Sequence, residues 1–110
     1  MKTIKISTEY SETPLGRYPE DGDYNGARFR DDYLRAALEK EDKVVVDIDD
    51  VEGYGSSFLE EAFGGLVRKG YFTATDLKRK LEIRYLHSEF RIYGELIWKY
   101  IKEAKVDKKN

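Results

Sequence analysis

The segment spanning residues 43–67 limits most strongly how this chain can fold. It reads KVVVDIDDVEGYGSSFLEEAFGGLV. Its first seven residues are rich in β-branched side chains and almost continuously apolar, which predicts a strand covered on both faces. After a tight turn containing Gly53 and Gly55, apolar residues recur at helical spacing over residues 57–69. The segment therefore predicts a buried strand, a glycine turn and an amphipathic helix.

The rest of the chain continues this alternation of strands and helices. Asn25 is the expected cap of one helix, and Gly70 is the expected end of another. Further strands are predicted at residues 3–7 and 81–86, helices at 26–40, 75–80 and 88–105, and an irregular connection with a short hairpin strand near Arg17 and Tyr18 at 11–25. This order predicts an α/β domain with a small, mainly parallel or mixed sheet and flanking helices.

Length and composition set outer bounds on this domain. A chain of 110 residues is expected to form one domain over residues 1–110 with one modest core, and residues 105–110 are expected to be a frayed tail. The chain has no cysteine, which excludes disulfides, thiolate zinc sites and cysteine nucleophiles. It shows neither a signal-peptide pattern nor an apolar run as long as a membrane span. We therefore expect a soluble, cytoplasmic protein without a membrane partner.

Charge is divided unevenly along the chain. The formal net charge is −2, but residues 1–66 contain 8 Lys and Arg against 16 Asp and Glu, and residues 67–110 contain 12 against 6. Two solvated faces of one domain explain such a division most simply, and a charged partner surface is the alternative.

The basic half contains a cluster of the kind that binds the phosphate backbone of a nucleic acid. Aromatic residues are interleaved with its cations, which are Arg68, Lys69, Lys78, Arg79, Lys80 and Arg84. A nucleic-acid-binding accessory protein is therefore one alternative function. The sequence pI of about 5.5 and the lack of a nucleic-acid motif favour a solvated surface or a contact with a protein.

Two serines stand at the expected start of the helix that follows the glycine turn. Ser57 with Glu60 has the spacing of a capping box, in which each side chain accepts a backbone N–H of the other residue. Ser56 precedes this cap, so its hydroxyl is less committed. A phosphate there would meet the positive end of the helix dipole and the repulsion of nearby carboxylates. Such a modification would change the surface sharply, as a switch requires.

The run VVVDIDDVEGYGSSFLEEAFGGL resembles the STAS domain, the fold of bacterial anti-sigma factor antagonists. It is most similar to the poorly characterised STAS-like branch of bacterial regulatory proteins, in which a similar GSSFLEEAFGGL run occurs. In the well-studied antagonists an Asp-Ser-Ser-Gly turn opens the matching helix, and a partner serine kinase phosphorylates its first serine. That serine matches Ser56 and the second matches Ser57, while Gly55 and Phe58 replace the aspartate and the glycine.

The resemblance implies a regulatory module that acts by protein–protein interaction, without catalysis and without a cofactor. Ser56 is the candidate phosphorylation site. The expected contact surface combines the turn with the exposed side of the helix and comprises Gly53, Tyr54, Gly55, Ser57, Glu60 and Glu61. The implied partner is a regulatory protein such as a serine kinase or an anti-sigma-like ATPase. Neither the identity of this partner nor the oligomeric state follows from the sequence.

The same turn is compatible with a second function. Glycines before a helix start are typical of sites that bind a phosphate, so a nucleotide- or phosphate-binding module using residues 53–57 is an alternative. The signal is weak, because the run lacks the last glycine of a dinucleotide fingerprint. It also lacks the Gly-Lys-Ser/Thr of a P-loop.

Other residue types that carry chemistry are sparse. Asp47, Asp49 and Asp50 lie at the end of one strand and offer oxygen ligands for magnesium, although bonds to nearby loop N–H groups or exposure to water are the commoner explanation. His87 is the only histidine, and a serine–histidine pair would have to use it. A surface or capping role is the simpler interpretation of His87. No convincing catalytic set or metal site is predicted.

Overall fold

A computed structural model describes residues 1–107. Each element is short, and several join end to end into longer helices. In chain order the elements are β1 (Lys2–Lys5), α1 (Ile6–Glu9), η1 (Pro19–Asp21), α2 (Gly26–Arg28), η2 (Phe29–Arg35), α3 (Ala36–Lys40), β2 (Val44–Asp47), α4 (Ser56–Leu59), η3 (Glu60–Gly64), α5 (Gly65–Arg68), α6 (Ala74–Lys80), β3 (Leu81–Arg84), η4 (Ser88–Phe90) and α7 (Arg91–Glu103).

The sheet has three parallel strands in the order β1-β2-β3. Lys2 pairs with Val44 and Val44 with Leu81, so the chain crosses over a helical layer between each strand and the next. This confirms the α/β class and the parallel sheet. The first strand is shorter than predicted, because Ile6 already begins α1, although Ile4 and Ile6 are both buried as expected.

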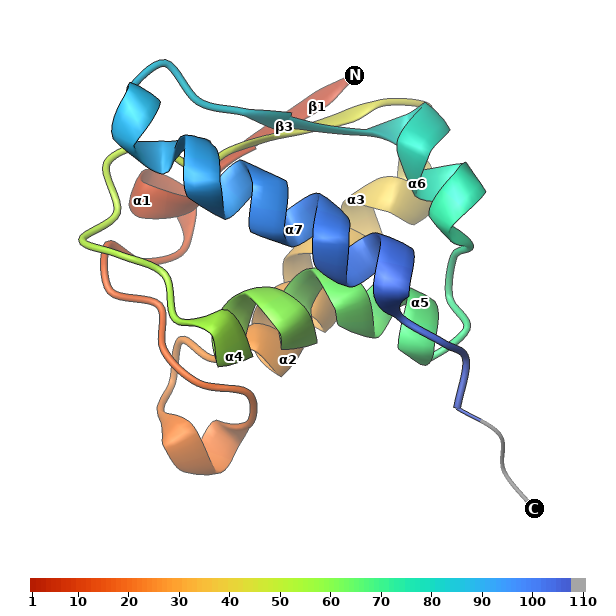
Figure 1. The fold of residues 1–110 in the computed structure, drawn as a ribbon, viewed down its shortest axis with the longest axis horizontal. Helices are drawn as coiled ribbons and strands as arrows, with labels where there is room; N and C mark the ends of the chain where they lie inside the picture. Colours follow the sequence, from red (N-terminus) through yellow and green to blue (C-terminus); the bar gives the residue numbers. More distant parts are fainter. Residues whose placement is uncertain (108–110) are drawn as a thin grey trace.

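The side chains of β2 are buried on both faces, as predicted, but a helical layer covers only one of these faces. The long helices lie on one side of the sheet, toward which Val44 and Val46 point as part of the core (Figure 1). Val45 points to the opposite face and is buried there, with its register partners Thr3 and Glu82 on either side. The β-branched run therefore reflects a central strand flanked by two others, not a strand between two helical layers.

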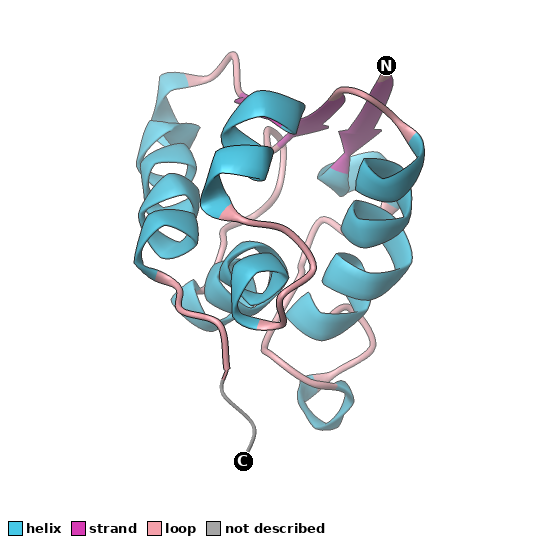
Figure 2. Cartoon of the chain, turned by 90° about the vertical axis from the view of Figure 1, so that its right-hand side faces the viewer, coloured by secondary structure: helices cyan, strands magenta, loops and turns pink. Residues whose placement is uncertain are grey.

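Two long helices and α7 form the layer beneath the sheet. The first long helix (residues 26–40) joins α2, η2 and α3, and the second long helix (residues 56–68) joins α4, η3 and α5. In each of them the middle portion is π-helical. The second long helix is viewed nearly end-on in Figure 2 and lies between α7 and the first long helix.

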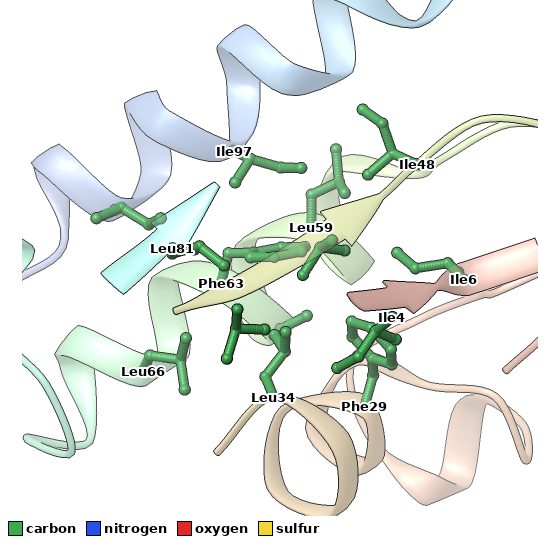
Figure 3. Close-up of a cluster of buried hydrophobic side chains, with 14 of the residues drawn as sticks. Ile4, Ile6, Phe29, Leu34, Ile48, Leu59, Phe63, Leu66, Leu81 and Ile97 are labelled. Atoms are coloured by element: carbon green, nitrogen blue, oxygen red, sulfur yellow. The ribbon is translucent and has the colours of Figure 1, made fainter. Parts of the chain in front are cut away.

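The core fills the space between the sheet and this helical layer. Figure 3 shows apolar side chains from every part of the chain meeting there, among them Ile4, Phe29, Leu34, Leu59, Phe63, Leu66, Leu81 and Ile97. Burial of such side chains is the main favourable contribution to folding, at about 25 cal/mol per Å² of apolar area removed from water.

Several helix ends agree with their sequence signals. The side chain of Asn25 caps the first long helix by accepting the N–H of Arg28 at 2.9 Å. Gly70 follows the second long helix with a φ of 77°, a conformation that side chains disfavour. The short helix α6 begins at Ala74, one residue earlier than predicted, after the cap Thr73.

The connection at residues 11–25 contains no hairpin strand near Arg17 and Tyr18. The 3₁₀ turn η1 occupies its tip instead. The carboxylate of Asp21 accepts the N–H groups of Arg17 and Tyr18, and the N–H of Leu15 donates to the carbonyl of Tyr24. The loop therefore closes on itself as a compact surface loop instead of pairing with the sheet.

The last helix is divided between η4 and α7 and ends at Glu103. Phe90, Ile97 and Ile101 on its predicted stripe are buried, while Ile92 is exposed. Residues 105–107 form neither helix nor strand, but the N–H of Asp107 donates to the carbonyl of Arg68 at 2.9 Å. The remainder of the predicted frayed tail, residues 108–110, lies outside the described residues.

Candidate functional site

The turn between β2 and the second long helix is built differently from the glycine turn that the sequence predicts. Gly55 has ordinary backbone angles, with φ −76° and ψ 148°, and Gly53 is not among the residues with positive φ. Asp50 adopts the left-handed conformation instead, with φ 66°. Aspartate tolerates this region better than most residues. The chain therefore bends directly after the strand, and residues 51–55 follow as a connection.

Tyr54 holds this connection in place and does not lie on its surface. Its ring is buried against Phe58 and Phe90, and its hydroxyl donates to the carbonyl of Ile48 at 2.9 Å. Burial raises the pKa of the Tyr54 hydroxyl, so it remains a neutral donor. The predicted role of Tyr54 as a partner-contact residue is wrong, because only 7% of its surface is exposed.

Ser56 and Ser57 are both exposed at the start of the second long helix. The helix begins at Ser56 with Gly55 as its N-cap, and no side chain caps it. The predicted capping box of Ser57 with Glu60 is therefore not formed. Since the first N–H groups of a helix have no partner within the helix, this start presents partial positive charge to solvent.

Glu60 and Glu61 are instead the centre of a charged network with three arginines. Glu61 is 1% exposed and accepts from Arg30, Arg17 and Arg68, the last at 3.0 Å. Glu60 accepts from Arg17 and Arg68. The prediction that these two glutamates lie on an exposed contact surface is wrong for Glu61, and Glu60 is largely occupied by its ion pairs. Guanidinium–carboxylate bonds are stronger than a neutral N–H bond at a helix end, which explains why Glu60 does not cap.

Two glycines make room for this network. A Cβ atom at Gly65 would lie 2.9 Å from a guanidinium nitrogen of Arg30, and one at Gly64 would lie 2.8 Å from a carboxylate oxygen of Glu60. Gly64 and Gly65 follow Glu60 and Glu61 by four residues, so each glycine lies on the same helix face as one glutamate. The run EEAFGG thus encodes a glutamate pair with the space that its arginines need. This spacing is the one sequence signal that could have revealed the network.

Arg30 is buried despite its charge. Burial lowers the pKa of Arg30, but its hydrogen bonds with Asp31 and Glu61 more than offset this, and the net shift is upward. Because Arg30 belongs to the first long helix and Glu61 to the second, their ion pair joins the two helices. A buried charge without a partner is costly, and Arg30 is paired with both Glu61 and Asp31.

Arg17 extends the network to the loop at residues 11–25 and places that loop beside the two serines. The hydrogen bond with Glu60 raises the pKa of Arg17 above its ordinary value. The bonded loop and the helix start form the walls of a groove of about 490 Å³, lined by Leu15, Gly16, Arg17, Asp21, Gly55, Ser56 and Ser57. Sequence reasoning missed Leu15, Arg17 and Asp21, because their proximity to the serines depends on contacts far apart in the chain.

The carboxylates at the end of β2 are occupied by hydrogen bonds. Asp49 is buried and accepts the N–H groups of Leu86 and His87, which confirms the interpretation of loop bonds for this residue. The hydrogen bond from Lys5 lowers the pKa of Asp50. No group of three or more possible metal-ligating side chains is found among residues 1–107.

His87 is exposed and lies apart from the serines. Its Nε2 is 3.8 Å from a carboxylate oxygen of Asp50. It lines a shallow hollow together with Asp50, Glu52 and Phe90, whereas Ser56 and Ser57 line the groove beside Arg17. The structure therefore does not bring the histidine and the serines together in one pocket.

The basic region of the sequence is not one continuous surface. Arg68 is partly buried in the network with the glutamates. Lys78, Arg79 and Lys80 lie on α6, and a guanidinium nitrogen of Arg84 is 3.9 Å from Asp47. Lys69 is exposed at the end of the second long helix, whereas Lys78, Arg79 and Lys80 share the last turn of α6.

Comparison with models of protein families shows to which family this chain belongs. The model of the STAS-like domain of unknown function matches residues 25–89, from the cap of the first long helix through the turn, the second long helix and β3. The chain belongs to this family. No curated protein and no solved structure gives a significant match. The resemblance seen in the sequence is thus confirmed at the level of the STAS-like domain.

The matched residues include most of the features described above. Arg30, Glu60, Glu61 and Arg68 of this STAS-like domain all lie within residues 25–89, whereas Arg17 and its loop precede them. The loop that lines the serine groove is thus outside the matched part. Within residues 1–107 no helix combines the length and the apolar character needed to cross a bilayer.

Proposed function

We propose that this STAS-like domain is a non-catalytic regulatory module that binds a partner protein through the surface around the start of the second long helix. The observation that supports this most strongly is the position of Ser56 and Ser57, exposed at an uncapped helix start and beside a groove. A surface of this kind offers a partner both free N–H groups and hydroxyls. The contact surface now comprises Gly53, Gly55, Ser56, Ser57, Leu15 and Asp21.

We further propose that phosphorylation of Ser56 switches this contact. A phosphate on Ser56 would meet the positive end of the helix and lie in the same groove as the guanidinium of Arg17. It would also meet the carboxylate of Asp21, whose pKa is lowered by hydrogen bonds from the backbone of Tyr18 and Arg17. The phosphate would therefore compete for Arg17 with Glu60 and change both the charge and the loop contacts of the surface.

The resemblance to anti-sigma factor antagonists supports the class of partner. In those proteins the serine at the position of Ser56 is modified by a serine kinase that is also the binding partner. The groove has room for a peptide side chain or a phosphate, and its rim is formed by the loop and the helix start. A serine kinase or an anti-sigma-like ATPase is therefore the regulatory partner that we propose.

The decisive experiment maps phosphorylation in an extract of the native cells. The purified chain is incubated in this extract with ATP, and phosphopeptides are identified by mass spectrometry. We expect one phosphoryl group on Ser56, which is lost in Ser56→Ala and kept in the matched control Ser57→Ala. The phosphorylated chain and Ser56→Asp should both differ from the unmodified chain in binding to the kinase. Modification of Ser57 alone, or an unmodified Ser56, would refute the switch.

A phosphate- or nucleotide-binding module remains the second candidate function. It is favoured by the uncapped helix start together with the guanidinium of Arg17 in the same groove. Inorganic phosphate or ATP should then raise the melting temperature of the chain, and Arg17→Met should abolish the rise. A melting temperature that does not change with either ligand would eliminate this candidate and leave the regulatory proposal intact.

A further inference from the structure

A second groove lies on the other side of the molecule, between α6 and α7. It has a volume of about 570 Å³ and is lined by Ala74, Thr75, Lys78, Trp98, Ile101 and Lys102. Trp98 is half-buried and is the only tryptophan of the chain. Four of the six lining residues offer apolar or methyl surface, and the two charged ones are exposed lysines. We call this feature the α6–α7 groove.

The charge of the α6–α7 groove specifies what it can accept. Lys78 and Lys102 are on opposite helices, and no carboxylate is among its lining residues. Apolar surface between two cations fits a segment that presents apolar side chains together with carboxylates. A basic or strongly polar segment would leave the lysines repelled and the indole of Trp98 without an apolar partner.

The loop at residues 11–25 of this same chain has that chemistry. It contains four carboxylates against one arginine, and that arginine points to Glu60 and Glu61. It also exposes three large apolar side chains, Leu15 at 63%, Tyr18 at 46% and Tyr24 at 43%. Four other large apolar side chains of residues 1–107 are exposed, Met1, Leu86, Ile92 and Val106, but no more than two of them lie within ten positions of one another.

The loop is fixed in shape before any contact is made. Within the loop the carboxylate of Asp21 accepts two backbone N–H groups, and the side-chain amide of Asn25 donates to the carbonyl of Gly22. The guanidinium of Arg28 donates to the carbonyl of Asp23. The guanidinium of Arg28 also lies 5.4 Å from the ring centroid of Tyr24. An ordered loop loses little conformational entropy on binding, which favours a loop as a docking element.

The two features lie at different ends of the molecule. In Figure 1 the loop around η1 projects at the lower left, while α6 and the C-terminal half of α7 lie at the right. The groove of one molecule therefore cannot receive its own loop. We propose that copies of this domain associate head to tail, with the loop at residues 11–25 of one copy seated in the α6–α7 groove of the next.

Such a contact has a defined symmetry and strength. Because the two surfaces are different, a pair of copies keeps one free loop and one free groove, so the association is open-ended or closes into a ring. A loop tip on one groove buries less than the roughly 1,200 Å² of a stable interface. The association is therefore weak, grows with concentration and weakens as salt screens the lysines and carboxylates. The unmodified chain is expected to form this contact, because the loop is already ordered by its internal hydrogen bonds.

The first test measures mass and the environment of Trp98 together. Sedimentation velocity should show an average mass that increases with concentration at low salt and returns to the monomer at high salt. Because Trp98 is the only tryptophan, its emission should shift to shorter wavelength over the same concentration range. A chain that stays monomeric at the highest accessible concentration in low salt would overturn the proposal and assign the groove to an acidic segment of another protein.

The second test exchanges the charges. One variant has an acidic groove, Lys78→Glu with Lys102→Glu, and the other has a basic loop, Glu20→Lys with Asp23→Lys. Each variant alone places like charges together, so its self-association should weaken by about tenfold or more. A mixture of the two should associate again. The acidic loop of the first variant matches the basic groove of the second, and the basic loop of the second matches the acidic groove of the first. Self-association that is unchanged in either variant would show that another surface is used.

The third test uses the lack of cysteine in the native chain. Leu15→Cys and Thr75→Cys are prepared separately, mixed and mildly oxidised. We expect the mixed disulfide between the two variants to dominate over either homodimer. Leu15→Cys mixed with Glu89→Cys is the matched control, since Glu89 is exposed but lies at η4, away from the groove. Equal yields in the two mixtures would contradict the proposed register.

Discussion

Two helix starts in this protein have similar sequence signals and opposite structures. Before α6, the side chain of Thr73 accepts the N–H of Asp76, and the carboxylate of Asp76 accepts the N–H of Thr73, both at 3.0 Å. Before the second long helix, Ser57 and Glu60 have the same spacing, yet the N-cap is Gly55 and no side chain caps the helix. One helix start is closed by its own residues and the other is open.

The difference shows that the spacing of two residues in the sequence makes a capping box possible, whereas the tertiary surroundings determine whether it forms. Asp76 is close to one exposed arginine, Arg79, so the backbone N–H groups remain its main partners. Glu60 lies among Arg17 and Arg68 in a partly buried site, where ion pairs are stronger. The network therefore stabilises the fold and also leaves the serine end of the helix accessible.

The largest effect is expected when the network loses its central charge. Glu61→Gln removes the buried one of the two carboxylates that pair with the guanidinium of Arg30 and leaves only the more exposed Asp31, which should lower the free energy of unfolding by about 3 kcal/mol. Urea denaturation measures this. The matched control is Glu39→Gln, which breaks the exposed pair of Arg35 with Glu39 and should change stability by about 0.5 kcal/mol or less. Similar losses in the two variants would show that burial does not govern the network.

A smaller loss is expected when the space for the network is filled. Gly65→Ala places a Cβ atom 2.9 Å from a guanidinium nitrogen of Arg30, and overpacking of this kind costs about 1–3 kcal/mol. The comparison is Gly55→Ala at the open helix start, where a Cβ meets nothing within 4 Å. Because glycine is a better N-cap than alanine, Gly55→Ala should still cost about 0.5 kcal/mol. Thermal unfolding of both variants would show whether the network is as tightly packed as the distances indicate.

The two helix starts can be compared directly by removing their hydroxyls. Thr73→Ala should lower the free energy of unfolding by about 1 kcal/mol, since it deletes a formed cap. Ser57→Ala should leave stability nearly unchanged, because Ser57 does not cap its helix. Both are measured by chemical denaturation under the same conditions. A loss in Ser57→Ala as large as that in Thr73→Ala would restore the capping box predicted from the sequence.

Local patterns were sufficient to predict most of the fold. The β-branched run of β2, the apolar period of the two long helices, the cap Asn25 and the stop Gly70 each act within a few residues, and the sequence displays them directly. The parallel order of the strands follows from the helices between them. The STAS-like resemblance rested on the same stretch.

The details of the site depend on pairs that are distant in sequence. Arg17 and Glu60 are 43 positions apart, and Arg30 and Glu61 are 31 apart, so no local period marks them. The left-handed angle at Asp50 replaced the expected glycine bend because the chain turns directly at the strand end. Exposure of the serines was predicted from the turn, whereas the burial of Tyr54 and Glu61 depends on tertiary packing.

The smallest effect that we predict concerns the carboxylates beside the two helix starts. Asp21 accepts the N–H groups of Tyr18 and Arg17, Asp76 accepts the N–H of Thr73, and these bonds lower the pKa of each carboxyl below its usual value of 3.8. A pKa that is lower in the folded chain adds stability above pH 3.8, and this stability is lost as the pH falls through the folded-state pKa. The denaturation midpoints of wild type and Asp21→Asn should therefore differ near neutral pH and converge in acid. Asp76→Asn should show the same dependence at the closed helix start. A difference between wild type and Asp21→Asn that persists unchanged into acid would mean that the loop beside the serines is held by Arg17 and not by the carboxylate of Asp21.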